Sequence, residues 1–143
     1  MPKRNLDPEK STARFDLTGR PVVMPKVLAA GFRAVFRIFD DWGLDNRQAM
    51  ALLGFPARST FFKWKQGQIG AVSHDTVQRV SYILGIYKAL QILYGDPMDA
   101  DAWIKRPSLA FGGRSALERM AGGDVSDLAA VRARLDAARG GAA

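Results

Sequence analysis

The sequence predicts an all-α protein. Three observations lead to this class: apolar residues recur at helical spacing, polar capping residues precede these segments, and glycines follow them. The segment from Ser73 to Tyr94 is the longest of them and is the predicted central helix. The chain has 143 residues, of which 48% are hydrophobic, so one compact domain or two small ones can form around a real core.

The central helix, residues 73–94, has a clear start and a clear stop. Ser73 is the expected N-cap, Asp75 lies in the first turn, where negative charge suits the helix dipole, and Gly95 follows the last apolar residue. Its second half is apolar on nearly all sides, which predicts burial all round, between two modules or against a partner. Lys88 and Gln91 interrupt the apolar run, so we expect no membrane span.

Composition excludes several classes of chemistry. The chain contains no cysteine and one histidine, His74, which rules out disulfides, thiolate metal sites and a cysteine nucleophile. The first residues contain no apolar run typical of a signal peptide, and we expect a cytoplasmic location. Ser73 next to His74 lacks an acid placed to complete a triad. We therefore expect no enzyme activity, no cofactor, no metal and no small-molecule substrate.

Two further motifs fit structural roles better than chemistry. The Phe111-Gly112-Gly113-Arg114 stretch has no following Gly-Lys-Ser/Thr, so we expect a tight turn that lets Phe111 and Arg114 project, instead of a phosphate loop. The aspartates at positions 96, 99 and 101 lack the glycine and distal glutamate of a calcium loop. Helix N-capping is the preferred interpretation of these aspartates.

Positive charge is concentrated before the central helix. The formal net charge is +7, and residues 21–72 carry seven basic against three acidic residues. From Asn46 through His74 there is no carboxylate at all. A one-signed patch within a folded segment indicates a polyanionic partner, and a solvated basic face is the alternative. Residues 1–20 are polar and are predicted to be a flexible basic arm; residues 21–94 and 95–143 follow as two structural units.

The segment before the central helix predicts a helix-turn-helix. Residues 21–42 form the first expected helix, with phenylalanines at helical spacing as core residues. Residues 45–53 form the second, with Asp45 and Gln48 as a capping box and Gly54 after its end. Ser59 is expected to begin the third, which Gly67 ends. Two short helices joined by a glycine-containing turn are typical of this motif, although such pairs also occur as purely structural units.

The third helix divides into an inner and an outer face. Thr60, Phe61 and Trp64 are spaced to pack inward, and Lys63 and Lys65 to face out. Gln48, Leu53-Gly54, Ser59-Thr60 and Trp64-Lys65-Gln66-Gly67 resemble the Xre (Cro/CI-like) helix-turn-helix family. The resemblance implies binding of double-stranded operator DNA by Arg47, Arg58, Ser59, Thr60, Lys63 and Lys65. Replacing either lysine with alanine should weaken binding equally across sequences, as loss of a phosphate contact does.

The C-terminal region predicts three short elements and a final helix. A helix at residues 98–104, a turn at 107–113 and a helix at 115–120, capped by Ser115 with Glu118, come first. Asp124 or Ser126 opens the last helix. Its apolar stripe consists of Val125, Leu128, Val131 and Leu135. Its predicted solvent-exposed side consists of Arg132, Arg134, Asp136 and Arg139.

This region carries a second resemblance. Trp103-Ile104, Pro107-Ser108, Phe111-Gly112-Gly113-Arg114-Ser115 and Leu117 resemble the toxin-binding domain of the Xre/MbcA/ParS antitoxins; Ala116 stands where many relatives have proline. The family implies a type II antitoxin that blocks the active site of a RES-domain, NAD⁺-degrading toxin. It also implies a homodimer that represses its own operon. The toxin-binding residues would be Trp103, Phe111, Arg114, Arg132, Arg134, Leu135 and Arg139.

Two other functions remain open from the residues alone. One is a stand-alone helix-turn-helix repressor without a toxin partner. The other is an interaction module whose helix-turn-helix binds duplex DNA without preference for its own promoter. For Trp103 and Phe111, an ordinary core position competes with a role in an interface, because aromatic residues dominate both.

Overall fold

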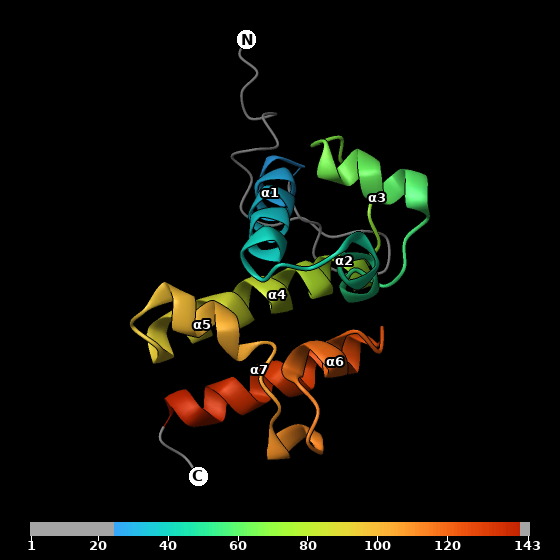
Figure 1. Cartoon of the computed structure of the whole chain (residues 1–143). Coiled ribbons are helices and arrows are strands. Elements are labelled where there is room, and N and C mark those ends of the chain that lie inside the picture. The colour runs from blue at the N-terminus through green and yellow to red at the C-terminus, as the bar shows by residue number, and fades with distance from the viewer. Residues whose placement is uncertain (1–24, 141–143) are drawn as a thin grey trace.

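The computed structural model describes residues 25–140, and over that range it confirms the all-α class (Figure 1). In chain order the helices are α1 (Pro25–Asp41), α2 (Asn46–Leu52), α3 (Arg58–Lys65), α4 (His74–Leu93), α5 (Pro97–Trp103), α6 (Ala116–Met120) and α7 (Val125–Arg139), with a 3₁₀ turn, η3 (Leu109–Phe111), between α5 and α6. The predicted basic arm at 1–20, the expected first turn at 21–24 and the tail at 141–143 lie outside the described residues.

Helix α4 runs through the middle of the molecule, with α1, α2 and α3 toward one side and α6 and α7 toward the other (Figure 1). It packs most extensively against α7 and α1, and Ile83, Ile86 and Leu90 are fully buried. The helix lies between two groups of helices, as expected, but its burial within the chain is incomplete: Ile92 is 53% exposed, and Lys88 is exposed. The reason is that neighbours cover opposite flanks of α4 and leave a strip of its second half open to solvent.

Aromatic packing holds α1 against α3, as the spacing of the phenylalanines predicts. The ring centroids of Phe32 and Trp64 are 4.9 Å apart, and those of Phe36 and Phe61 are 5.4 Å apart. Phe32, Phe61 and Trp64 are buried. These contacts set the angle at which α3 crosses the first helix, and so they decide which residues of α3 point outward.

The capping predictions for α2 and α6 are confirmed. The Asp45 carboxylate accepts the Gln48 backbone N–H at 2.8 Å, and the Gln48 side chain accepts the Asp45 N–H at 3.0 Å. Ser115 and Glu118 make the same reciprocal pair at the start of α6, at 3.0 and 2.9 Å. Each box satisfies two backbone donors that the helix itself leaves without a partner, which explains why helices of seven and five residues form here.

The starts of α4 and α7 are also capped. The Ser73 hydroxyl accepts the Thr76 N–H at 3.1 Å, as expected. Of the two candidates for α7, Asp124 is the cap: its carboxylate accepts the Ser126 N–H at 2.9 Å. Hydrogen bonds from Ser126, first from its backbone and then from its side chain, lower the pKa of Asp124.

A buried arginine joins three parts of the chain. Arg79 on α4 is only 6% exposed, and its Nε donates to Asp75 at 2.7 Å. Its Nη2 donates to the Gly123 carbonyl at 2.9 Å, and its Nη1 lies 3.5 Å from the Leu52 carbonyl. Leu52 ends α2 and Gly123 precedes α7, so one guanidinium links the helix-turn-helix to the C-terminal helices. The guanidinium lies directly over Gly54, where a Cβ would come within 2.9 Å of its Cζ.

Candidate functional site

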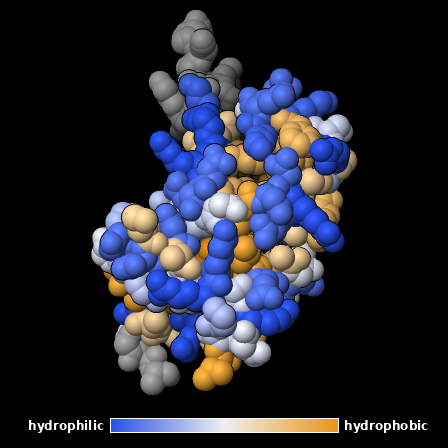
Figure 2. Space-filling model, in the orientation of Figure 1, coloured by the Kyte–Doolittle hydropathy of each residue, from blue (hydrophilic) through white to orange (hydrophobic). Residues whose placement is uncertain are grey.

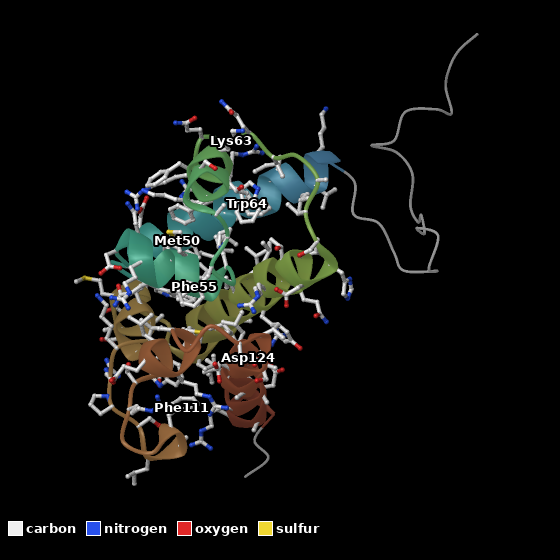
Figure 3. All side chains as sticks on the ribbon, turned by 90° about the vertical axis from the view of Figure 1, so that its right-hand side faces the viewer. Met50, Phe55, Lys63, Trp64, Phe111 and Asp124 are labelled. Carbon is white, nitrogen blue, oxygen red and sulfur yellow. The ribbon has the colours of Figure 1, made fainter. Side chains whose placement is uncertain are left out.

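The outer face of α3 is polar and cationic. Arg58, Ser59, Lys63 and Lys65 are exposed, and Thr60 is half-buried. Figure 3 shows Lys63 on the outer side of α3 and Trp64 on the side toward α1. The predicted split of this helix into an inner and an outer face is therefore correct, with Thr60 at the border between the two.

The start of α2 and the end of α3 lie close together. The Lys65 ammonium donates to the Asn46 side-chain oxygen at 3.2 Å, and exposed Arg47 follows Asn46. The structure thus places the start of α2, which carries Arg47, beside the end of α3. The six residues expected to bind DNA come from α2 and α3, the two helices that this hydrogen bond connects, and a helix-turn-helix contacts DNA with both of its helices.

Helix α3 starts one residue earlier than expected. Ser59 lies in the first turn and does not cap the helix; the N-cap is Ala57, whose carbonyl accepts the Phe61 N–H at 2.9 Å. No side chain caps this end, and its first turn contains no acidic residue. Its first backbone N–H groups therefore stay available, and such a helix start favours anions such as phosphate.

Two arginines of α1 extend this basic surface. Arg33 and Arg37 are exposed and line a groove of about 660 Å³ between α1 and the end of α3, together with Asp40, Trp64 and Lys65. Neither arginine was among the residues expected from the sequence to bind DNA. Their spacing could have indicated a shared surface, because residues four apart on the polar side of an amphipathic helix lie on one face.

Apolar surface also appears on this part of the molecule. Figure 2 shows hydrophobic surface over α3, set among hydrophilic side chains. Phe62 is half-buried, and its ring lies 5.0 Å from the Arg58 Cζ and 5.9 Å from the Lys65 Nζ. Such cation–π contacts hold both cations close to an aromatic ring.

In the C-terminal half, a braced loop connects α5 to α6. Pro107 and Ser115 form an isolated β-bridge. The Ser108 N–H donates to the Arg114 carbonyl at 3.0 Å, and the Gly113 N–H donates to the Ser108 carbonyl at 2.8 Å. The expected tight turn is confirmed, since Gly112 has a φ of 67° and Gly113 a φ of 85°. These bonds leave the loop few alternative conformations.

The residue that this loop presents is not the expected one. Phe111, predicted to project, is only 6% exposed and packs against half-buried Trp103, with ring centroids 6.3 Å apart. Leu109 is instead 96% exposed, and Arg114 is exposed as predicted. The backbone bonds of the 3₁₀ turn orient Phe111 inward, and the turn carries Leu109 to its outer side. The sequence held no periodic signal for this exchange, because the turn is only three residues long.

The buried and exposed sides of α7 agree with the prediction only in part. Arg134 and Arg139 are exposed, as expected. Leu135 is 2% exposed and belongs to the core, as the apolar stripe predicts, so its assignment as a toxin-binding residue is not supported by its position. Arg132, placed on the solvent-exposed side from the sequence, is half-buried. Its Nε donates to both carboxylate oxygens of Asp136, at 3.0 and 3.1 Å. Its guanidinium lies directly on Gly85 of α4, whose missing side chain makes room for it.

Arg132 also lines a shallow groove of about 440 Å³ along the first half of α4, together with His74, Val77, Gln78, Ser81 and Tyr82. His74 lies in the first turn of α4, as predicted, and the neighbouring Asp75 carboxylate is paired with Arg79 at 2.7 Å. The Asp75 carboxylate is therefore engaged by Arg79 and does not serve as the acid of a catalytic triad with His74.

The N-capping prediction for the aspartates near α5 holds for Asp96 alone: Asp99 lies in the first turn of the helix, and Asp101 lies in its second half. Asp96 caps α5 by accepting the Met98 N–H at 2.9 Å, and Asp101 accepts a hydrogen bond from Gln91 at 3.2 Å. Desolvation, followed by the charge of Asp41, raises the pKa of Asp101. Within residues 25–140, no group of three or more histidine or acidic side chains is placed to hold a metal ion.

The protein is of the class that joins a DNA-binding helix-turn-helix unit to a compact helical module, and here the two parts share helix α4. Residues 29–85 match the antitoxin Xre-like helix-turn-helix domain. Residues 89–141 match the antitoxin Xre/MbcA/ParS C-terminal toxin-binding domain. The chain is also similar to the uncharacterised protein y4oB of Sinorhizobium fredii (strain NBRC 101917 / NGR234), with 51% identity over 112 residues, which is 78% of this chain and 86% of that protein.

The chain belongs to the Xre/MbcA/ParS family of antitoxins. It is an antitoxin of a toxin–antitoxin system and carries a DNA-binding helix-turn-helix. Both matched ranges divide α4, because one ends at residue 85 and the other begins at residue 89. Over the part of the chain that the structure describes, no helix is long and apolar enough to cross a membrane.

Proposed function

We propose that this chain neutralises a RES-domain toxin that degrades NAD⁺, by covering the active site of the toxin with its C-terminal half. The observation that carries the proposal is the match of residues 89–141 to the toxin-binding domain. The toxin class comes from the family resemblance. The braced loop supports a binding role, because it presents Leu109 and Arg114 on a rigid base, and pre-organised contacts lose little entropy on binding.

The second part of the proposal is repression of its own operon by a homodimer in the cytoplasm, without any catalytic activity. Arg47, Arg58 and Lys63 would contact operator DNA. Figure 3 shows Lys63 and Phe111 toward opposite ends of the molecule, so the two candidate surfaces are separate. This separation supports a chain that holds toxin and DNA at the same time.

The experiment is expression of the adjacent gene with and without this chain, followed by measurement of growth, cellular NAD⁺ and co-purification. We expect the neighbour to stop growth and deplete NAD⁺, and this chain to restore both in a stable complex. Growth arrest at constant NAD⁺ would keep the antitoxin role and remove the RES toxin. A harmless neighbour that does not co-purify would favour the stand-alone repressor.

A matched pair of variants locates the toxin interface. Leu109→Ser removes an exposed apolar side chain from the braced loop, and Val27→Ser removes one from α1, where Val27 is 61% exposed. Because buried apolar anchors dominate interface energies, we expect Leu109→Ser to weaken the complex by about ten-fold or more. Val27→Ser should leave its affinity unchanged. Equal affinities for both variants would remove the loop from the interface.

A further inference from the structure

Phe62 is the aromatic residue of α3 that the core leaves partly uncovered. Phe61 and Trp64, on the inner side of the helix, are 0% and 7% exposed, whereas Phe62 is half-buried. Its ring packs against Phe61 at nearly a right angle, with centroids 5.2 Å apart. The uncovered part of this ring is apolar area that a partner could bury with a gain in free energy.

The position of Phe62 places its ring on the DNA-reading face. Arg58 lies four residues before it, Ser59 three before it and Lys65 three after it, so these side chains neighbour one another on the helix surface. The Arg58 and Lys65 cations lie over the ring, at 5.0 and 5.9 Å from its centroid. The ring is therefore surrounded by the side chains that would contact the DNA backbone.

The positive charge around the Phe62 ring indicates what kind of partner it binds. No carboxylate occurs from Asn46 through His74, so two copies of this face would repel each other, and a polyanion is favoured. The major groove of DNA presents one exposed methyl group, on C5 of thymine, and an apolar side chain is the group that recognises it. The ring could therefore contact a thymine methyl group while the cations on either side of it contact the neighbouring phosphates.

We propose that Phe62 reads a thymine in the operator by packing its ring against the C5-methyl group. The inference rests on the DNA-binding role of the helix-turn-helix and adds to it a residue that determines sequence preference. Arg58 and Lys65 contribute by neutralising the phosphates on either side, which brings the ring to the base edge. Lys63, which is not one of the two cations over the ring, would act on the DNA backbone alone.

The test uses a duplex selected from a random-sequence library by the wild-type chain, labelled with fluorescein. Each thymine is replaced in turn by deoxyuridine, which lacks only the methyl group. By fluorescence anisotropy, we expect replacement at one position in each half-site to weaken wild-type binding about four-fold per methyl group, the value for one buried CH₂-sized group. Other thymines should show no change.

Variants assign the effect to Phe62. Phe62→Gln should bind more weakly and lose the distinction between thymine and deoxyuridine, whereas Phe62→Leu, which stays apolar, should keep it. Lys63→Ala is the matched control: it should weaken binding to both duplexes and keep their ratio. Circular dichroism melting of each variant establishes that it is folded.

Three results would overturn the inference. If the wild-type chain binds its selected duplex tightly but no deoxyuridine replacement weakens it, the ring reads no methyl group, and the DNA-binding role stands without this inference. If Phe62→Gln folds and keeps the wild-type ratio, another residue reads the thymine. If the library yields no preferred duplex at all, the DNA-binding role and the inference fail together. The deoxyuridine scan of the wild-type chain needs no variant, so it decides even if Phe62→Gln does not fold.

Discussion

At the scale of single residues, Arg79 shows how a buried charge is accommodated. A charged group removed from water is costly unless it is paired and hydrogen-bonded. Arg79 has the Asp75 carboxylate and two backbone carbonyls as partners. Gly54 provides the space beneath the guanidinium, and its φ of 85° is a conformation that residues with a Cβ adopt at a cost.

Two glycine substitutions separate these contributions to stability. Gly67 has a φ of 88° with open space around it, so Gly67→Ala should cost only the backbone strain, roughly 1–2 kcal/mol. Gly54→Ala carries the same strain and also displaces the Arg79 guanidinium. We expect it to cost at least about 1 kcal/mol more, since hydrogen bonds to a charged group are lost. Urea unfolding of both variants measures the difference, and equal losses would show that Arg79 shifts without cost.

At the scale of helices, local chemistry was predictable and long-range packing was not. Asp45, Ser73 and Ser115 were assigned as caps from the sequence, because a cap depends on residues within one turn. The burial of Phe111 depends on the conformation of a three-residue turn and on packing against Trp103. The contact of Arg132 with Gly85 depends on where distant segments meet. The role of Arg79 is of the same kind, since its partners Leu52 and Gly123 are 27 and 44 residues away.

The cap of α7 should make stability depend on pH. Hydrogen bonds from Ser126 lower the pKa of Asp124 in the folded chain. The stabilisation is therefore fully present above the ordinary pKa of an aspartate and is lost as the pH falls through the lowered value. We expect Asp124→Ala to be less stable than wild type at pH 7, with a difference that shrinks as the solution is acidified.

Ser73→Ala is the control for this prediction, because it removes a cap whose hydroxyl does not titrate. Its loss of stability, about 1 kcal/mol, should stay constant over the same pH range. Urea unfolding at several pH values measures both variants against wild type. A loss for Asp124→Ala that does not change with pH would show that the charge of Asp124 contributes nothing to the cap.

At the scale of the whole molecule, the two functional halves share one core. Buried residues of α1, α3, α4, α6 and α7 belong to a single hydrophobic cluster, and α4 contributes to both sides of it. The expected division into residues 21–94 and 95–143 places the boundary just after α4, whereas the matched family domains meet inside that helix. A helix covered on opposite flanks does not belong to either half alone.

Removal of the C-terminal half should therefore destroy the cooperative fold of the rest. A fragment of residues 1–94 exposes the α4 surface that α7 covers and leaves Arg79 without its Gly123 partner. We expect no sigmoidal thermal transition by circular dichroism and strong binding of an apolar dye, whereas the full chain should unfold in one step, as small single domains do. A fragment that melts cooperatively within a few degrees of the full chain would show that the helix-turn-helix folds on its own. In that case the hydrogen bond from Arg79 to the Gly123 carbonyl would join two independent domains.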